Sequence, residues 1–138
     1  MIDEGFKKLK IYQLSHQLAI EVHSMTLKLP KQEMFEEASQ IRRSSKSVSA
    51  QIVEGYSLRK YKNEYLHYLY RSYASAEETI EHLEYLFETR SMSDVTLFKD
   101  LRERYESLCK QEFVFIQTIE AWTEPPRFVK EEGDDYVP

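Results

Sequence analysis

The segment from Gln40 to Gly55 constrains the fold of this chain more than any other stretch. Four of its residues, Ile41, Ser45, Val48 and Ile52, recur at spacings of four, three and four. This spacing places side chains on one face of an α-helix. Small residues crowd the same segment, and serine hydroxyls within helices bond back to the preceding turn. We therefore predict a long helix whose axis packs closely against its neighbours.

A glycine follows this segment and marks the expected end of the helix. Glycine takes the left-handed conformation of a helix C′ position without steric cost. We therefore predict that the helix, which begins near residue 32, ends at Glu54 and that Gly55 terminates it.

Three further segments show the same helical period, at about 6–29, 61–89 and 94–122. Pro30 separates the first two predicted helices, and a turn at 90–93 precedes the last one, with Ser93 as its expected N-cap. The predicted inward line of the third helix is Leu66, Leu69, Tyr73, Ala76, Ile80, Leu83 and Phe87. The line of the fourth helix is Phe98, Leu101, Tyr105, Leu108, Glu112, Phe115, Ile119 and Trp122, with Glu112 as its one charged member.

Four helices joined by short links predict an all-α fold, an antiparallel up-down-up-down four-helix bundle of left-handed twist over residues 1–123. The chain has only 3 glycines and 4 prolines in 138 residues, which argues against an all-β fold with many turns. Residues 124–138 are acidic and follow helix-breaking prolines, so we predict a disordered C-terminal tail.

The single cysteine, Cys109, cannot form an internal disulfide, which favours a reducing, cytoplasmic location. The first residues lack the basic and then apolar layout of a signal peptide. No apolar run approaches the roughly 20 residues that span a bilayer, so we expect no membrane partner.

The formal net charge is −5, but the charge is unevenly distributed. Six basic residues lie between positions 40 and 63, opposed only by Glu54; they are Arg42, Arg43, Lys46, Arg59, Lys60 and Lys62. Six of the ten tyrosines lie in or near this segment, and nucleic-acid bases stack on exposed aromatic rings. The segment is therefore a candidate site for RNA or DNA. The alternative is that the lysines are merely solvated and the tyrosines fill the core or a subunit interface.

Polar residues form a second stripe beside the apolar face of the second helix. With two residues of the third helix they make a predicted structural polar network: Gln40, Ser47, Gln51, Glu54, Ser75 and Glu78. Such a network fixes helix register because each member must find a partner. The alternative is acid–base chemistry by Glu54 and Glu78. The sequence places no nucleophile beside them, so we predict no catalytic residues and no enzyme.

Two short motifs could suggest a metal site. Glu64 and His67 have the spacing used in di-iron bundles, but those sites need two such motifs and further glutamates. Glu78 and His82 are four residues apart, and two ligands are too few for structural zinc. We therefore predict no metal and no cofactor.

The order of residues also resembles a known family. The runs that carry the resemblance are Gln40-Ile41-Arg42-Arg43, Ser47-Val48, Gln51-Ile52-Val53-Glu54-Gly55, Leu29-Pro30-Lys31 and Ser75-Ala76-Glu77-Glu78. They are similar to the signature of the four-helix-bundle proteins encoded in 23S rRNA intervening sequences, also called the S23 ribosomal protein family. Gln51 stands where that family has asparagine, and Val53 where it has alanine.

The resemblance implies a bundle that assembles into a homopentameric ring. It also implies kinship with the accessory protein of diversity-generating retroelements, which binds nucleic acid and a reverse transcriptase. The expected function is thus a non-catalytic oligomer that binds nucleic acid through the basic segment. A protein-interaction scaffold without a nucleic-acid role is the alternative.

Overall fold

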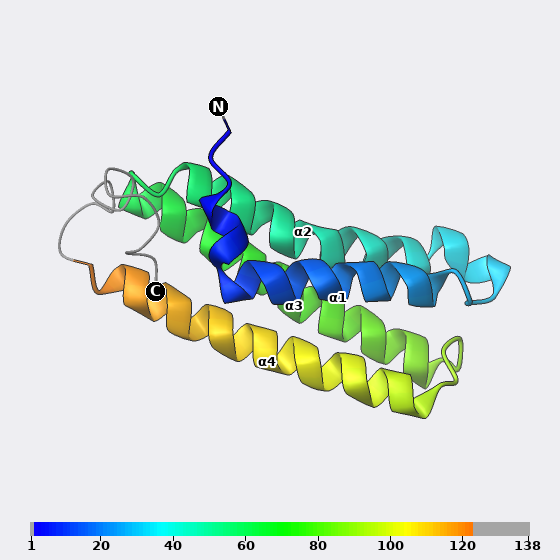
Figure 1. Ribbon diagram of the computed structural model, residues 1–138. Coiled ribbons are helices and arrows are strands. Elements are labelled where there is room, and N and C mark those ends of the chain that lie inside the picture. Colours follow the sequence, from blue (N-terminus) through cyan, green and yellow to red (C-terminus); the bar gives the residue numbers. More distant parts are fainter. Residues whose placement is uncertain (1, 123–138) are drawn as a thin grey trace.

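The computed structural model describes residues 2–122, without the side chains of residues 34 and 35. Four helices make up almost all of it: α1 (Lys10–Thr26), α2 (Glu37–Ser57), α3 (Lys62–Glu88) and α4 (Val95–Glu120). Two short 3-10 turns, Gly5–Lys8 and Lys31–Phe35, precede α1 and α2. The helices lie side by side in alternating directions, so α1 begins and α4 ends at the same end of the molecule (Figure 1).

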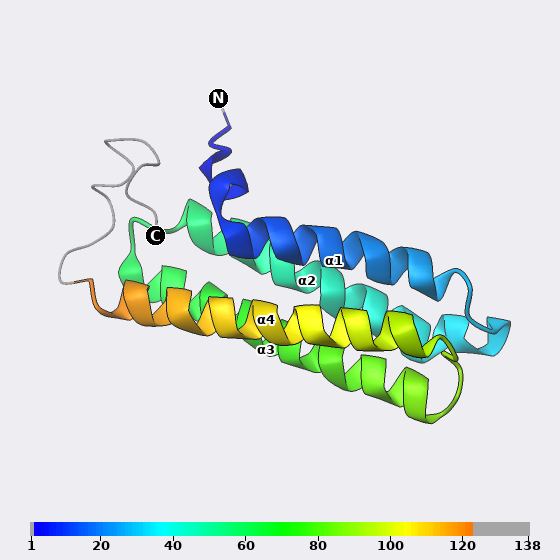
Figure 2. The same ribbon diagram turned by 60° about the horizontal axis from the view of Figure 1, so that its bottom comes forward.

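Each helix packs on the next along the chain, and α4 returns to pack on α1 (Figure 2). The predicted all-α four-helix bundle is therefore confirmed, while its handedness stays a prediction. Within residues 2–122, none of the helices combines the length and apolar character needed to cross a membrane. The predicted tail, 124–138, lies outside the described residues.

The inward face of α2 is the one that the sequence indicates. Ile41, Ser45, Val48 and Ile52 are all fully buried. Ser45 donates to the carbonyl oxygen of Arg42, as expected for a helical serine. On α4, the predicted line from Leu101 to Ile119 is also buried, including Glu112.

The buried line of α3 contains Leu69, Ala76 and Leu83, as predicted, but differs from the prediction at its other positions. The interior residues are Tyr65, Leu69, Ser72, Ala76, Thr79, Leu83 and Leu86. Leu66, Tyr73, Ile80 and Phe87, which we predicted to point inward, are only half-buried. The helix is rotated because the hydroxyls of Ser72 and Thr79 find partners on neighbouring helices, which lets polar residues occupy core positions.

The prediction for Gly55 is wrong, because α2 continues through it to Ser57. Gly55 is buried, and the reason for a glycine is closeness to α3. A Cβ at this position would lie 3.0 Å from Cβ of Tyr68 and 3.3 Å from a ring carbon of Tyr65. Gly55 therefore allows the end of α2 and the start of α3 to approach each other.

The turn between α3 and α4 also departs from the prediction in its capping. Asp94, and not Ser93, is the N-cap of α4, and its carboxylate accepts from the backbone N–H of Leu97 at 3.0 Å. Arg90 follows α3 with a φ of 67°, the left-handed conformation common just after a helix.

Candidate nucleic-acid interface on helices α1 and α2

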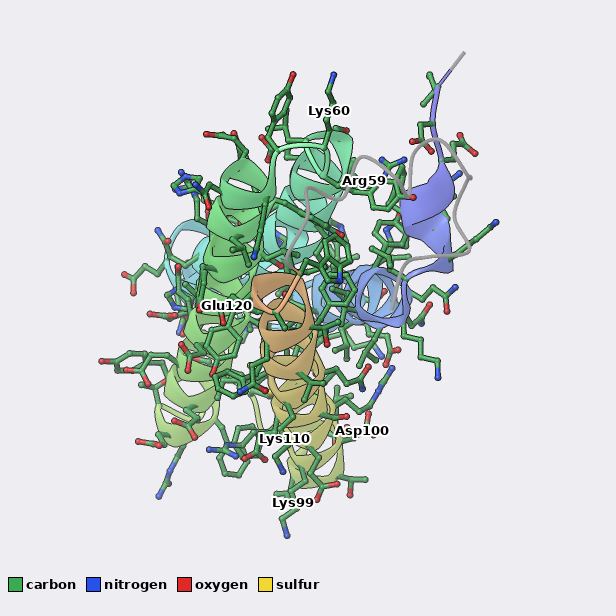
Figure 3. All side chains as sticks on the ribbon, turned by 90° about the vertical axis from the view of Figure 1, so that its left-hand side faces the viewer. Arg59, Lys60, Lys99, Asp100, Lys110 and Glu120 are labelled. Atoms are coloured by element: carbon green, nitrogen blue, oxygen red, sulfur yellow. The ribbon has the colours of Figure 1, made fainter. Side chains whose placement is uncertain are left out.

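The six basic residues predicted as a nucleic-acid site do not form one surface. Arg42, Arg43 and Lys46 lie in the first half of α2, while Lys60 lies beyond its far end. At 1.5 Å per residue, about 16 Å of helix separates Lys46 from Ser57, where α2 ends. Lys60 points away from the bundle at that end, while Arg59 turns toward the N-terminal segment (Figure 3). The basic segment is therefore divided between two places.

Arg59 belongs to the interior. Its side chain is 6% exposed and forms an ion pair with Asp3 at 2.8 Å. It also donates to the carbonyl oxygen of Tyr56, and its guanidinium carbon lies 3.8 Å from the centre of the Tyr56 ring. These contacts tie the N-terminal segment to the end of α2, so Arg59 is occupied in holding the fold.

Lys62 also serves the fold. Its ammonium group donates to the carbonyl oxygen of Glu120 at 2.8 Å and to that of Trp122. The last carbonyls of a helix lack partners within the helix and carry partial negative charge. Lys62, at the first residue of α3, thus caps the end of α4.

Two of the three basic residues in the first half of α2 contact the second half of α1. Arg42 donates to the hydroxyl of Thr26 at 3.1 Å, and the Lys46 ammonium lies 3.2 Å from Nδ1 of His23. These two residues join two helices on one side of the bundle, while Arg43 is exposed on α2.

A groove of about 400 Å³ runs between α1 and α2 at this place. Its main lining residues are His16, Ala19, Ile20, His23, Lys46 and Ser49. None of the described residues that line it is acidic, and Ile20 is half exposed. Sequence reasoning missed this groove, although the seven-residue spacing of His16 and His23 puts both rings on one face of α1.

The two halves of the bundle carry opposite formal charge. Residues 10–60, which hold α1 and α2, contain eight Lys or Arg and five Asp or Glu, a net charge of +3. Residues 61–122, which hold α3 and α4, contain seven and twelve, a net charge of −5. The excess of basic residues therefore lies on the α1–α2 half of an acidic protein, although Arg59 is buried and paired with Asp3.

The tyrosines near the basic segment divide between the core and the surface. Tyr56 and Tyr65 are buried, and burial raises the pKa of the Tyr65 phenol well above its ordinary value. Tyr61 and Tyr70 are exposed, but Tyr70 donates to the carboxylate of Glu120 at 2.7 Å. The described tyrosines therefore offer few free rings for base stacking.

Of the predicted polar network, the structure joins one pair between helices: Ser75 donates to the side-chain oxygen of Gln51 at 3.0 Å. Ser47 bonds back to the carbonyl of Arg43 on its own helix. Gln40 and Glu54 are exposed and bond to no other member of the network within residues 2–122.

Glu78 has a different partner from the predicted ones. It lies 3.1 Å from Nε2 of His82, whose Nδ1 lies 2.6 Å from Glu37 at the start of α2. Glu54 is 17 residues further along α2, which is about 25 Å of helix. Glu54 and Glu78 therefore do not meet, and an acid–base pair between them is ruled out in this structure.

The polar contacts that cross the core involve residues which the sequence reading missed. Thr79 donates to Ser44 at 2.9 Å. Ser72 lies 2.8 Å from the carbonyl oxygen of Val48 and 2.6 Å from the carboxyl group of Glu112. Burial raises the pKa of Glu112 to about 8 against a weaker lowering effect of the Ser72 hydrogen bond. Only the interruption of the α4 apolar line by Glu112 hinted at this group.

The other titratable side chains of the described residues do not form a metal-binding or nucleophilic site. Among the described residues, no three His, Cys, Asp or Glu side chains come together as metal ligands would. Glu64 and His67 are exposed on α3. Burial raises the pKa of the Cys109 thiol to about 12, so this thiol is poorly nucleophilic.

The sequential packing of four helices places this chain in the class of all-α four-helix bundles. It belongs to the family of 23S rRNA-intervening sequence proteins, whose family model matches residues 7–112. The fold is also similar to the crystal structure of a protein of unknown function of the S23 ribosomal protein family from Bacteroides thetaiotaomicron VPI-5482. The TM-score is 0.68 at 20% identity, covering 78% of this chain and 95% of the other. No curated protein matches the chain.

Proposed function

We propose that this chain is a non-catalytic, self-associating bundle that binds RNA or another nucleic acid on its α1–α2 side. The observation that carries the proposal is the groove between α1 and α2. Lys46, His16 and His23 border it, and no described lining residue is acidic. Phosphate groups are bound by cationic side chains, and this electrostatic part of binding needs no base recognition.

The proposed contact residues are fewer than the sequence suggested. Arg43 and Lys46 remain available on the surface of α2, with Arg42 beside them. Arg59 and Lys62 are excluded from the proposed contact surface, because their side chains already serve the fold. Lys60 is excluded because it lies at the far end of α2 from the groove.

The experiment is a titration of labelled, structured RNA with the full chain at two salt concentrations. We expect binding that weakens steeply between about 50 and 200 mM salt, because phosphate contacts release counterions. The double variant Arg43→Glu/Lys46→Glu should bind at least about tenfold more weakly than the native chain.

The matched control changes two other exposed basic residues by the same charge, Lys60→Glu/Lys99→Glu. It should keep most of the affinity, because neither residue lies in the first half of α2 or borders the groove. Equal loss in both double variants would mean a diffuse effect of net charge and would overturn the assignment. So would the absence of binding at low salt.

A second observation supports self-association or a protein partner. Phe113 is about half exposed on α4, and with Tyr73 and Cys109 it lines a hollow of about 530 Å³. Exposed apolar residues that gather at one place are typical of protein interfaces. We propose that copies of the chain meet there and form a pentamer, as the family resemblance implies.

Light scattering on a size-exclusion column tests the assembly. The native chain should have the mass of five copies, and Phe113→Ser should dissociate it without unfolding it. A native chain that stays monomeric at high concentration would refute self-association. Assembly without any RNA binding would favour the protein-scaffold function instead.

A further inference from the structure

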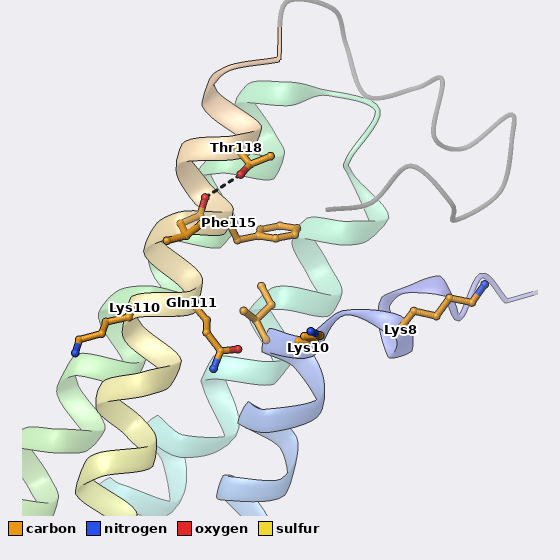
Figure 4. A pocket seen from close by; sticks show the side chains of 8 residues that line it. Lys8, Lys10, Lys110, Gln111, Phe115 and Thr118 are labelled. Atoms are coloured by element: carbon orange, nitrogen blue, oxygen red, sulfur yellow. Dashed lines mark hydrogen bonds between the residues drawn. The ribbon is translucent and has the colours of Figure 1, made fainter.

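A second groove, of about 610 Å³, lies between the start of α1 and the last turns of α4. Lysines border it on both sides: Lys8 ends the first 3-10 turn, Lys10 begins α1, and Lys110 belongs to α4 (Figure 4). Its apolar lining is Ile11, Val114 and Phe115. This groove is separate from the α1–α2 groove of the proposed nucleic-acid interface.

The chemistry of the groove selects for a ligand that is both acidic and apolar. None of the described residues that line it is acidic. A further hollow, between α3 and α4, is different, since Glu77 and Glu106 line it. Val114 is 60% exposed, so an apolar side chain seated beside it would remove apolar surface from water.

The chain itself continues past this place. Thr118, which lines the groove, lies two residues before the end of α4. Lys62 holds the carbonyls of Glu120 and Trp122, which fixes the point where the following segment leaves the bundle. Sixteen residues follow Trp122, and they include Glu131-Glu132-Gly133-Asp134-Asp135-Tyr136-Val137.

The length of this segment is sufficient to reach the groove. From Trp122 back to Lys110 is about 18 Å along the axis of α4. The nine residues from Trp122 to Glu131 can span up to about 30 Å when extended. Residues 131–137 can therefore lie along the whole groove of their own chain.

We propose that the groove binds residues 131–137 of the same chain. The four carboxylates of that segment neutralise the lysines at the border of the groove, and Tyr136 and Val137 cover Ile11 and Val114. Each exposed ion pair contributes little by itself. The tether provides an effective concentration in the millimolar range, which makes weak contacts sufficient for intramolecular binding.

Zero-length carbodiimide cross-linking of the native chain tests this proposal, because it joins only a lysine and a carboxylate that touch. We expect mass spectrometry to find links from Glu131, Glu132, Asp134 or Asp135 to Lys8, Lys10 or Lys110. The exposed lysines Lys28 and Lys31, between α1 and α2, and Lys99, near the start of α4, are the internal control. Links to the groove should exceed links to these controls at least about fivefold and fall severalfold in high salt.

An equal mixture of ¹⁴N- and ¹⁵N-labelled protein, unfolded together and refolded so that any assembly contains both isotopes, identifies the source of the segment. Links within one isotope support the proposal, whereas links between isotopes mean that a second copy occupies the groove and overturn it. Val114→Glu should reduce the links at least about threefold, and Val95→Glu, an exposed valine at the start of α4, should leave them unchanged. No links to the groove lysines, or equal links to the control lysines, would also overturn the proposal.

Discussion

The hydroxyl oxygen of Ser72 lies 2.6 Å from a carboxyl oxygen of Glu112, in the interior of the bundle. The same hydroxyl lies 2.8 Å from the carbonyl oxygen of Val48, and a serine has only one hydrogen to donate. Both contacts are satisfied if Glu112 is protonated: its O–H donates to Ser72, and Ser72 donates to Val48. The raised pKa of Glu112, about 8, agrees with this arrangement.

Glu112 should make the stability of the protein depend on pH. Because its pKa is raised in the folded state, the folded chain holds this proton more firmly than the unfolded chain does. The free energy of unfolding should therefore be highest below the ordinary carboxyl pKa and should fall as pH rises through about 8. The loss could reach about 5 kcal/mol. Urea unfolding between about pH 5 and pH 9 measures it.

The variant Glu112→Gln should remove most of this pH dependence and be more stable than the native chain at about pH 9. Glu103→Gln, on an exposed position of α4, should keep the native profile. If Glu112→Gln lost stability in parallel with the native chain, Glu112 would not be the titrating group.

Gly55→Ala should destabilise the protein although it replaces glycine within a helix. Intrinsic helix preference alone would favour alanine by about 1 kcal/mol. The added methyl group, however, would lie 3.0 Å from Cβ of Tyr68, which is fixed to the backbone of α3. We expect a net loss of roughly 1 to 2 kcal/mol in thermal or urea unfolding. Ala50→Gly lies on the exposed face of α2 and therefore measures the difference in helix preference between alanine and glycine without a packing effect. A gain in stability for Gly55→Ala would contradict the close packing of α2 on α3.

The ion pair between Glu21 on α1 and Arg104 on α4 should contribute measurably at neutral pH. Two guanidinium nitrogens of Arg104 lie 2.7 and 2.8 Å from the two oxygens of Glu21. This hydrogen bonding lowers the pKa of Glu21. The stabilisation is therefore present above the ordinary carboxyl pKa and is lost as pH falls through the lowered value.

Glu21→Gln should cost about 1 kcal/mol near pH 7 and less in acid. Asp100→Asn is the matched control, since Asp100 is more exposed and contacts Arg104 at 3.2 Å. It should cost less than Glu21→Gln. If Glu21→Gln and Asp100→Asn lowered the free energy of unfolding equally at every pH, the bidentate contact of Glu21 would contribute no extra stability.

Lys62→Met should loosen the end of α4 and leave nucleic-acid affinity unchanged. The ammonium group that caps the Glu120 and Trp122 carbonyls would be lost, at a cost of roughly 0.5 to 1 kcal/mol. Amide hydrogen exchange at the end of α4 should accelerate. Lys60→Met removes an exposed lysine and should change neither the hydrogen exchange of α4 nor the RNA affinity. If Lys62→Met alone lowered the RNA affinity, Lys62 would be a nucleic-acid contact after all.

Most of the fold was predictable because the spacing of apolar residues along a helix determines which of its faces is buried against the other helices. Ile41, Val48 and Ile52 on α2 illustrate this, and so does the α4 line that includes Glu112. The rotation of α3 was not predictable, because Ser72 and Thr79 are polar and their core partners lie on other helices. Gly55 was misassigned because a helix-ending glycine and a close-packing glycine look the same in the sequence.

The candidate site was less predictable, because residues close in sequence need not share a surface. Arg59 and Lys62 stand within the basic segment, yet their partners, Asp3 and the carbonyl of Glu120, lie more than fifty residues away. The groove near Lys46 depends equally on His16 and His23 from another helix. Such partners become visible only when the helices are packed.

The opposite charges of the α1–α2 and α3–α4 halves limit how identical copies can meet. A two-fold axis through either half would place like charges opposite one another. A contact that joins only the α1–α2 side of one copy to the α3–α4 side of the next would have no two-fold axis, because each copy would present one side to the copy ahead and the other to the copy behind. Repeated by a constant rotation, such a head-to-tail contact would close only when several copies complete the circle.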